Sequence, residues 1–355
     1  EVQLSTGADV EYTKLDIVLD PDGGDDNDPP ELSPYPLPGL PPELIDQEAN
    51  DAALRALFKG RERVVAGAWI ETGLDLGQGV TLTPGFRLDV YDIGESTLLA
   101  PEPRINVRYQ VSPRVSLIHD FGIAHQAPSF AVPVPGLEGD AGSGLQTGVL
   151  SSAGTEIELG NDFLGSFTLF QNMLFEGTDA FGLMQLQRAD SSIDNDTDRA
   201  TAHTYGFEVY LRRPLTHRLG GFLSYTLSRS TRALGRIKAP SSFDRTHVLN
   251  LALAYDLGRA WRIGGRFLTY TGIPGEVAYP EAATNPPRTP IFYRIDWRLE
   301  KRWRLGKTGF WAFVVEVLNT TLHKETLELS CYAHGCTSEE IGPVTVPSLG
   351  VEAAL

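Results

Sequence analysis

Charged side chains recur at alternate positions in several segments of the chain, and these are the residues best suited to chemistry. In the segment 291–303, Arg294, Arg298 and Glu300 fall on even positions, whereas the odd positions are mostly apolar or aromatic. Arginine and glutamate on one face of a strand bind a charged ligand or form lateral ion pairs that stiffen the sheet. We favour the ion pairs and keep ligand binding as the alternative. The residues expected on this charged side, which would face the lumen if the strands form a barrel, are Arg104, Arg108, Arg294, Asp296, Arg298, Glu300, Arg302 and Glu316.

An acidic run near the start of the chain is a candidate cation site. Its carboxylates are closely spaced, and oxygen ligands suit a hard cation such as Ca²⁺. However, Gly24 and Asp25 stand where a calcium loop has a ligand and then its glycine. We therefore favour a solvated acidic loop and keep calcium binding as the alternative; the segment 194–198 has the same ambiguity. The candidate calcium ligands are Asp20, Asp22, Asp26, Asp28 and Glu31.

Two cysteines, Cys331 and Cys336, are five residues apart in a polar segment. In an oxidising compartment such a pair forms a small disulfide most simply. A zinc site that adds His323 and His334 is the alternative, but the spacing fits no standard zinc pattern. We predict the disulfide.

Catalytic groups do not assemble into a recognisable set in this sequence. The seven histidines are scattered, and none combines with a nucleophile and a carboxylate at a persuasive spacing. We predict that the chain is not an enzyme and that it carries no cofactor besides the calcium considered above.

Composition limits the remaining possibilities. The 355 residues carry a formal net charge of −16, and 14 of the 46 acidic residues lie in positions 1–60. An acidic chain is a poor partner for nucleic acid, because such binding needs cationic side chains that neutralise the phosphates. No stretch approaches the ~18 consecutive apolar residues that a membrane-spanning helix needs.

The elements that would hold the charged residues are strands, because apolar and polar residues alternate with period two along most of the chain. These segments exceed the roughly 5–6 residues usual in soluble sandwiches and approach the ~9–11 that cross a bilayer obliquely. Short connections alternate with long ones, which is typical of outer-membrane barrels with tight periplasmic turns and long outer loops. The long connections are expected near 20–60, 93–101, 125–145, 177–200, 230–243, 273–290 and 322–345.

We therefore predict an all-β fold, a single antiparallel transmembrane β-barrel over residues 1–355 with about 14 strands and both termini in the periplasm. The first long loop, 20–60, is acidic and is expected to contain a short amphipathic helix within 41–58. A soluble all-β binding protein is the alternative. The predicted strands are 3–19, 61–75, 79–92, 103–112, 114–125, 146–160, 162–176, 201–213, 215–230, 244–257, 259–272, 290–304, 308–321 and 345–355.

Several stretches resemble the later part of the barrel of TonB-dependent outer-membrane receptors. Together they cover roughly residues 61–355. They are Pro103–Leu117, Gln126–Phe130 (Gln-Ala-Pro-Ser-Phe), Phe243–Leu251, Tyr293–Trp303, Glu316–Asn319 and Pro347–Leu355.

This resemblance implies a bacterial outer-membrane protein that takes up or binds a scarce ligand, siderophore-like or another nutrient. Family members carry a TonB box and a plug within a barrel of twenty-two strands, and this sequence has neither a visible plug nor a visible TonB box. The chain is then expected to be the C-terminal part of a longer receptor or a smaller, plug-less barrel. Its final residue, Leu355, differs from the aromatic residue usual there.

The partners implied are outer-membrane lipid, a small-molecule ligand and a protein that completes or plugs the barrel. The long loops would be extracellular. The alternative function is a passive, porin-like channel or a barrel scaffold that anchors a surface complex.

Overall fold

The chain folds into β-strands and the turns and loops that connect them over the residues that the computed structural model describes. These residues are 2–15, 61–93, 96–127, 144–177, 200–215, 218–235, 237–277, 284–306, 309–332 and 334–354. Within these ranges no helix is long and apolar enough to cross a membrane. The predicted helix at 41–58 lies outside the described residues, and the described part of the chain contains no helix.

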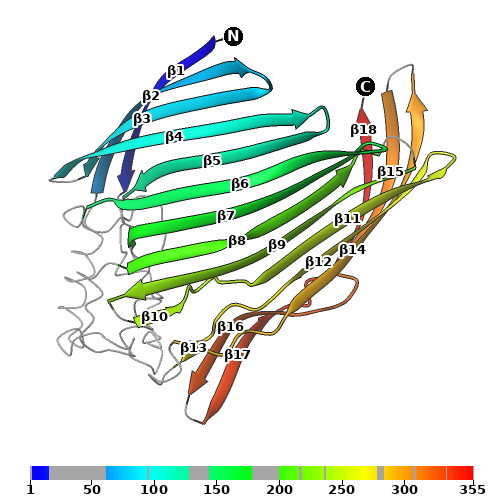
Figure 1. The fold of residues 1–355 in the computed structure, drawn as a ribbon. Helices are drawn as coiled ribbons and strands as arrows, with labels where there is room; N and C mark the ends of the chain where they lie inside the picture. Colours follow the sequence, from blue (N-terminus) through cyan, green and yellow to red (C-terminus); the bar gives the residue numbers. More distant parts are fainter. Residues whose placement is uncertain are drawn as a thin grey trace.

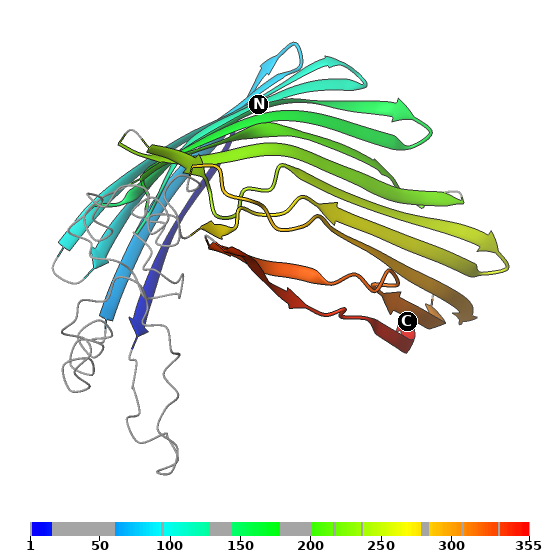
Figure 2. The ribbon, with the colours of Figure 1, turned by 90° about the horizontal axis from the view of Figure 1, so that it is seen from below.

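One large antiparallel sheet contains most of the strands and curves like the wall of a barrel (Figures 1 and 2). Fourteen strands follow one another along this sheet almost entirely in sequence order, which confirms the predicted strand number and all-β class. They are β1 (Val2–Leu15), β2 (Arg61–Gly77), β3 (Val80–Ile93), β4 (Ser96–Ser112), β5 (Val115–Gln126), β6 (Gln146–Gly160), β7 (Phe163–Gly177), β8 (Ala200–Arg213), β9 (Leu219–Leu234), β11 (His247–Gly258), β12 (Trp261–Tyr270), β14 (Phe292–Leu305), β15 (Gly309–Leu318) and β18 (Val346–Ala354).

Six short connections lie at one end of the sheet, which we call the short-turn end, whereas the two-residue connection between β3 and β4 lies at the opposite end. At the β6–β7 turn, Asn161 and Asp162 both have positive φ (51° and 64°), the combination that a type I′ hairpin turn requires. At the β2–β3 and β11–β12 turns, an aspartate carboxylate accepts the N–H of the glycine two residues later: Asp75 from Gly77 at 2.9 Å, and Asp256 from Gly258 at 2.8 Å. These local bonds fix where each hairpin reverses.

The two faces of the sheet differ in composition and in exposure. Apolar residues are exposed on one face, the outer face: Trp297 is 49% exposed and Leu253 46% exposed. Charged residues are buried on the other, the inner face, where Glu300 is 4% exposed and Asp296 7% exposed. A soluble protein has the opposite arrangement, whereas a barrel wall in lipid turns its apolar residues outward.

The aromatic residues of the outer face mark two levels on the wall. Trp303 and Trp311 stack at the short-turn end with ring centroids 4.1 Å apart, and Tyr293 stacks on His323 near the opposite end. Ten residues separate Trp303 from Tyr293 along β14, about 33 Å of strand at ~3.3 Å per residue. A strand tilted by about 40° spans ~25 Å of depth over that length, which is the height of the apolar band of an outer-membrane barrel.

One of the long loops predicted from the sequence is wrong. The segment 93–101 is mostly strand, because β4 begins at Ser96 and pairs with β3 from there. Pro101 and Pro103 made this segment look like a loop in the sequence, because proline interrupts a strand pattern. They are tolerated because β5 pairs with β4 only from Arg104 onward, so one side of β4 is unpaired at both prolines.

Four further strands lie in segments that the sequence predicted as loops. β10 (Ile237–Pro240) pairs with β9, and β13 (Glu276–Val277), β16 (Glu325–Tyr332) and β17 (Gly335–Ile341) form a separate three-stranded sheet. This small sheet lies at the long-loop end of the wall, below β12 and β14 in Figure 1.

The large sheet has two edges. Within the described residues β1 pairs with β2 alone and β18 pairs with β15 alone. Val2 pairs with Leu74 and Ala354 pairs with Phe310, so the start of β1 and the end of β18 both lie at the short-turn end.

Candidate functional site

The inner face of β14 carries a cluster of ion pairs centred on Arg298. Its guanidinium contacts Glu316 on β15 at 2.5 Å, Glu300 at 3.0 Å and both carboxylate oxygens of Glu352 on β18 at 2.9 Å. Because these carboxylates belong to three successive strands, Arg298 ties the wall together laterally up to its edge. All three contacts to Glu300 and Glu352 come from one nitrogen, Nη2, and the contact to Glu316 comes from Nη1.

Glu300 is the most deeply buried member of this cluster. It accepts from Arg302 on the same strand as well as from Arg298, and Arg262 on β12 lies 3.6 Å away. Three guanidinium groups therefore surround one carboxylate, which offsets the cost of removing that charge from water.

Arg294 and Asp296 lie on the same face of β14 as Arg298, four and two residues before it, toward the long-loop end. Their side chains approach to 3.0 Å, and Asp296 also accepts the N–H of Asn319 at 2.8 Å. Asn319 follows directly after β15, so Asp296 fixes the point at which the chain leaves the wall.

The remaining charged residues predicted on this face, Arg104 and Arg108, form a second group on β4. Arg104 pairs with Glu71 at 2.9 Å and Arg108 with Glu156 at 2.5 Å. Eight strand spacings separate β4 from β14 along the sheet, about 38 Å at ~4.8 Å per strand. The structure therefore places the eight predicted residues in two distant groups, and each group contains ion pairs between strands.

A hollow of about 390 Å³, lined by polar and apolar residues, opens on the inner face between β2 and β7. Asp120 lies in it and accepts from Asn106 at 2.5 Å and from Ser152 at 3.2 Å. The other polar side chains around it are Glu71, Thr83, Arg104 and Asn172. A second hollow of about 330 Å³, which also includes Asn172, continues toward the long-loop end. These surfaces can hydrogen bond to a polar solute or to a polypeptide inside the barrel.

Sequence reasoning missed a buried anchor at Asp244, between β10 and β11. Its side chain is fully buried; it accepts the N–H of Ser230 at 2.5 Å and pairs with Arg229 and Arg288. Arg288 also donates to the backbone oxygens of Asp244 at 2.7 Å and Gly272 at 3.1 Å. This network ties the β12–β14 connection to the wall. The segment Phe243–Leu251 was noted in the sequence, but nothing there identified Arg288 as the partner.

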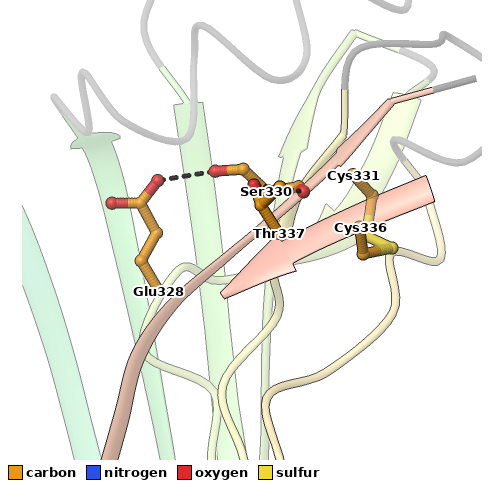
Figure 3. The surroundings of a disulfide bond; sticks show 5 residues. All are labelled: Glu328, Ser330, Cys331, Cys336 and Thr337. Carbon is orange, nitrogen blue, oxygen red and sulfur yellow. Dashed lines mark hydrogen bonds between the residues drawn. A yellow bond between two sulfur atoms is a disulfide. The ribbon is translucent and has the colours of Figure 1, made fainter. Parts of the chain in front are cut away.

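The small sheet at the long-loop end holds both cysteines. Cys331 on β16 and Cys336 on β17 are register partners joined by a disulfide (Figure 3). On the same hairpin Ser330 donates to Glu328 at 2.7 Å, and Val277 of β13 pairs with Cys331. The disulfide thus fastens an ordered hairpin that rises from the β15–β18 connection.

The candidate calcium ligands Asp20, Asp22, Asp26, Asp28 and Glu31 lie outside the described residues. Calcium binding there stays a prediction. Among the residues that the structure does describe, no group of three or more histidine, cysteine or acidic side chains is arranged to hold a metal.

The sequence matches the family model described as TonB dependent receptor-like, beta-barrel, over residues 3–319. The chain belongs to this TonB-dependent receptor-like β-barrel family. The matched span runs from β1 to the end of β15 and so contains nearly the whole wall. A search of curated proteins finds no match.

Solved structures of TonB-dependent receptors share this fold at low sequence identity. The chain is similar to the ferric citrate transporter FecA (TM-score 0.64, 15% identity, 83% of this chain and 46% of that chain). It is also similar to the ferripyoverdine receptor of Pseudomonas aeruginosa (0.62, 12%, 83% and 39%) and to the ferric-catecholate import receptor Fiu from E. coli K12 (0.60, 13%, 83% and 45%). The chain therefore spans less than half of the length of each of these TonB-dependent receptors.

Proposed function

We propose that this chain forms the greater part of the barrel wall of an outer-membrane receptor that takes up a scarce ligand, with ferric siderophores as the leading ligand class. The observation that carries the proposal is the inverted wall: an exposed apolar outer face, a charged and internally paired inner face, and a match to the TonB-dependent receptor-like β-barrel family. The three similar structures named above are a ferric-catecholate import receptor, a ferric citrate transporter and a ferripyoverdine receptor, which supports the ligand class.

We place the short-turn end in the periplasm and the long-loop end outside the cell. Outer-membrane barrels have short periplasmic turns and longer extracellular loops. Five of the six connections at the short-turn end are no longer than three residues, whereas at the other end only the β3–β4 and β9–β10 connections are that short among those that join described strands of the large sheet. The disulfide hairpin then lies on the extracellular side, where an oxidised cysteine pair persists. A soluble ligand would meet the long connections first and the polar inner face afterwards.

The inner-face hollows supply the contacts that a polar solute or an inserted polypeptide needs. Arg104, Asn106 and Asp120 present a guanidinium, an amide and a carboxylate at one level of the wall. We assign no catalytic step to any of them. The partner that fills the barrel, whether a plug or a ligand, would bind against this surface.

Uptake of iron by cells tests the proposal. A strain that lacks the gene for the full-length protein is supplied with radioactive iron as ferric citrate, as a ferric catecholate or as ferripyoverdine, with and without a protonophore. We expect one of these probes to lose uptake in the deletion strain, to regain it on complementation and to lose it again with the protonophore. Uptake that survives the protonophore would indicate the passive channel instead, and unchanged uptake of all three probes would refute the ligand class.

A further inference from the structure

A single cation stands out on the outer face of β14, near the short-turn end. Lys301 belongs to the same alternating set as Trp297, Leu299 and Trp303, and its neighbour across the strand pair is Trp261 on β12. Its ammonium lies 5.2 Å from the ring centre of Trp261 and 5.8 Å from that of Trp303. A lysine among tryptophans at this level is positioned at the boundary between lipid tails and headgroups.

The ammonium of Lys301 keeps hydrogen-bonding capacity for a ligand. It donates to the backbone oxygen of Arg259 in the β11–β12 turn, and an ammonium has three N–H donors in total. The bond to the turn holds the charge at the rim of the wall. The carboxylates of β14 lie on the inner face, so on its own face Lys301 is surrounded by aromatic rings.

A groove of about 350 Å³ runs along the outer face above Lys301. Gly265 borders it, in a row whose other members are Leu253 and Trp297. A Cβ at Gly265 would lie 3.0 Å from the nearest ring carbon of Trp297, so the indole covers the glycine and forms one side of the groove. The surface of its lining is almost wholly apolar; Leu219, Leu251, Tyr255, Ile263, Phe267 and Ile295 contribute to it, and Gly264 and Arg266 also border the groove.

The cation and the groove lie on one line up the wall. Lys301 is two residues from Leu299 and four from Trp297, and the corresponding partners on β12 are Trp261, Ile263 and Gly265. Four residues of strand cover about 13 Å, and a tilt of about 40° turns this into ~10 Å of depth. With the lipid headgroups at the level of Lys301, the groove begins ~10 Å deeper in the membrane. This depth lies within one leaflet, because the whole hydrocarbon core is ~30 Å thick.

We propose that this face binds one phospholipid molecule in the leaflet at the short-turn end, with its phosphate on Lys301 and one acyl chain in the groove beside Gly265 and Trp297. The inference rests on the membrane location in the proposed function and goes beyond it by naming a lipid site on the wall. Charge complementarity selects a phosphodiester, since one ammonium balances one phosphate, and the apolar groove selects an attached acyl chain over free phosphate.

Native mass spectrometry of the full-length protein tests this site. The protein is released from a mild detergent after incubation with phosphatidylglycerol, and the fraction that retains one lipid is titrated. We expect Lys301→Gln and Gly265→Leu each to weaken retention at least tenfold, the first by removing the cation and the second by displacing the Trp297 indole that forms one side of the groove. Inorganic phosphate at millimolar concentration should not displace the lipid.

Two matched substitutions control for charge and for glycine. Lys324→Gln removes an exposed lysine in the β15–β18 connection, and Gly165→Leu fills a glycine position on the outer face of β7; both should retain lipid as the unmodified protein does. Heat-modifiable gel mobility verifies folding, and Gly265→Ala replaces the leucine variant if that fails to fold, with a smaller loss expected.

The inference is overturned if the unmodified protein retains no lipid, if Lys301→Gln retains as much as Lys324→Gln, or if phosphate alone displaces the lipid. These results leave iron uptake intact, and so they are distinct from a failure of the proposed function, which uptake and membrane fractionation report.

Discussion

Replacing Asp244 by asparagine should release the β12–β14 connection from the wall. The carboxylate is fully buried and accepts from Ser230 N–H and from the guanidinium groups of Arg229 and Arg288. Hydrogen bonds to a charged group contribute about 1.5–3 kcal/mol each, and asparagine keeps the shape while replacing one acceptor by a donor. We expect a loss of about 2–3 kcal/mol in the free energy that holds this segment closed.

Thermolysin cleavage within residues 271–291 measures that free energy. When opening is fast relative to cleavage, the cleavage rate follows the population of the open form. A change of about 2–3 kcal/mol corresponds to a ~30- to 150-fold faster rate, since every 1.4 kcal/mol is about tenfold. Asp256→Asn is the matched control, because that carboxylate accepts only the N–H of Gly258 at the opposite end of β11 among the bonds the structure shows for it.

A double-mutant cycle separates the ion pair from other effects of the substitution. Arg288→Gln alone should also speed cleavage, and the combination with Asp244→Asn should cost less than the two single changes added together, because both remove the same interaction. A cleavage rate within threefold of the unmodified protein, or strict additivity, would refute the assignment of Asp244 as the anchor.

Three further outcomes follow from the wall and its loops. Arg298→Ala should lower the temperature at which the protein loses its heat-modifiable gel mobility, because it removes the ion pair to Glu352 on the edge strand β18. Among the polar contacts that the structure describes, Arg266→Ala removes only a hydrogen bond to Asn250 at 3.0 Å and should lower that temperature less. Lipids brominated on their acyl chains should quench the four outer-face tryptophans, but a variant that keeps only Trp69, on the inner face beside Arg104, should be quenched by aqueous iodide instead. Reduction of the Cys331–Cys336 disulfide should speed proteolysis of the hairpin without changing the heat-modifiable mobility, because β16 and β17 are not part of the large sheet; a loss of that mobility would contradict the separation.

The strand order could be predicted from the sequence because period two is a local signal. Each hairpin needs only an alternating segment and a turn, as at Gly160–Asp162, and the strands then pair with their neighbours along the chain. The exceptions are also local in origin. Pro101 and Pro103 interrupt the pattern of β4, and β16 follows a connection whose composition resembles a loop.

The partners of the charged residues could not be predicted in the same way. The sequence places Arg298 on the inner face, but its contact with Glu352 depends on the registers of β14 with β15 and of β15 with β18. Asp244 and Arg288 are 44 residues apart and meet only because two connections fold back onto the wall. Pair identity therefore depends on register and on loop packing, which alternation alone does not encode.

The opposite directions of the two edge strands restrict how this ribbon can become a ring. β1 ascends from the short-turn end and β18 descends toward it, and a backbone left unpaired in hydrocarbon costs several kcal/mol for each exposed group. If the seam is sealed by antiparallel neighbours throughout, the number of strands inserted between β18 and β1 is zero or even.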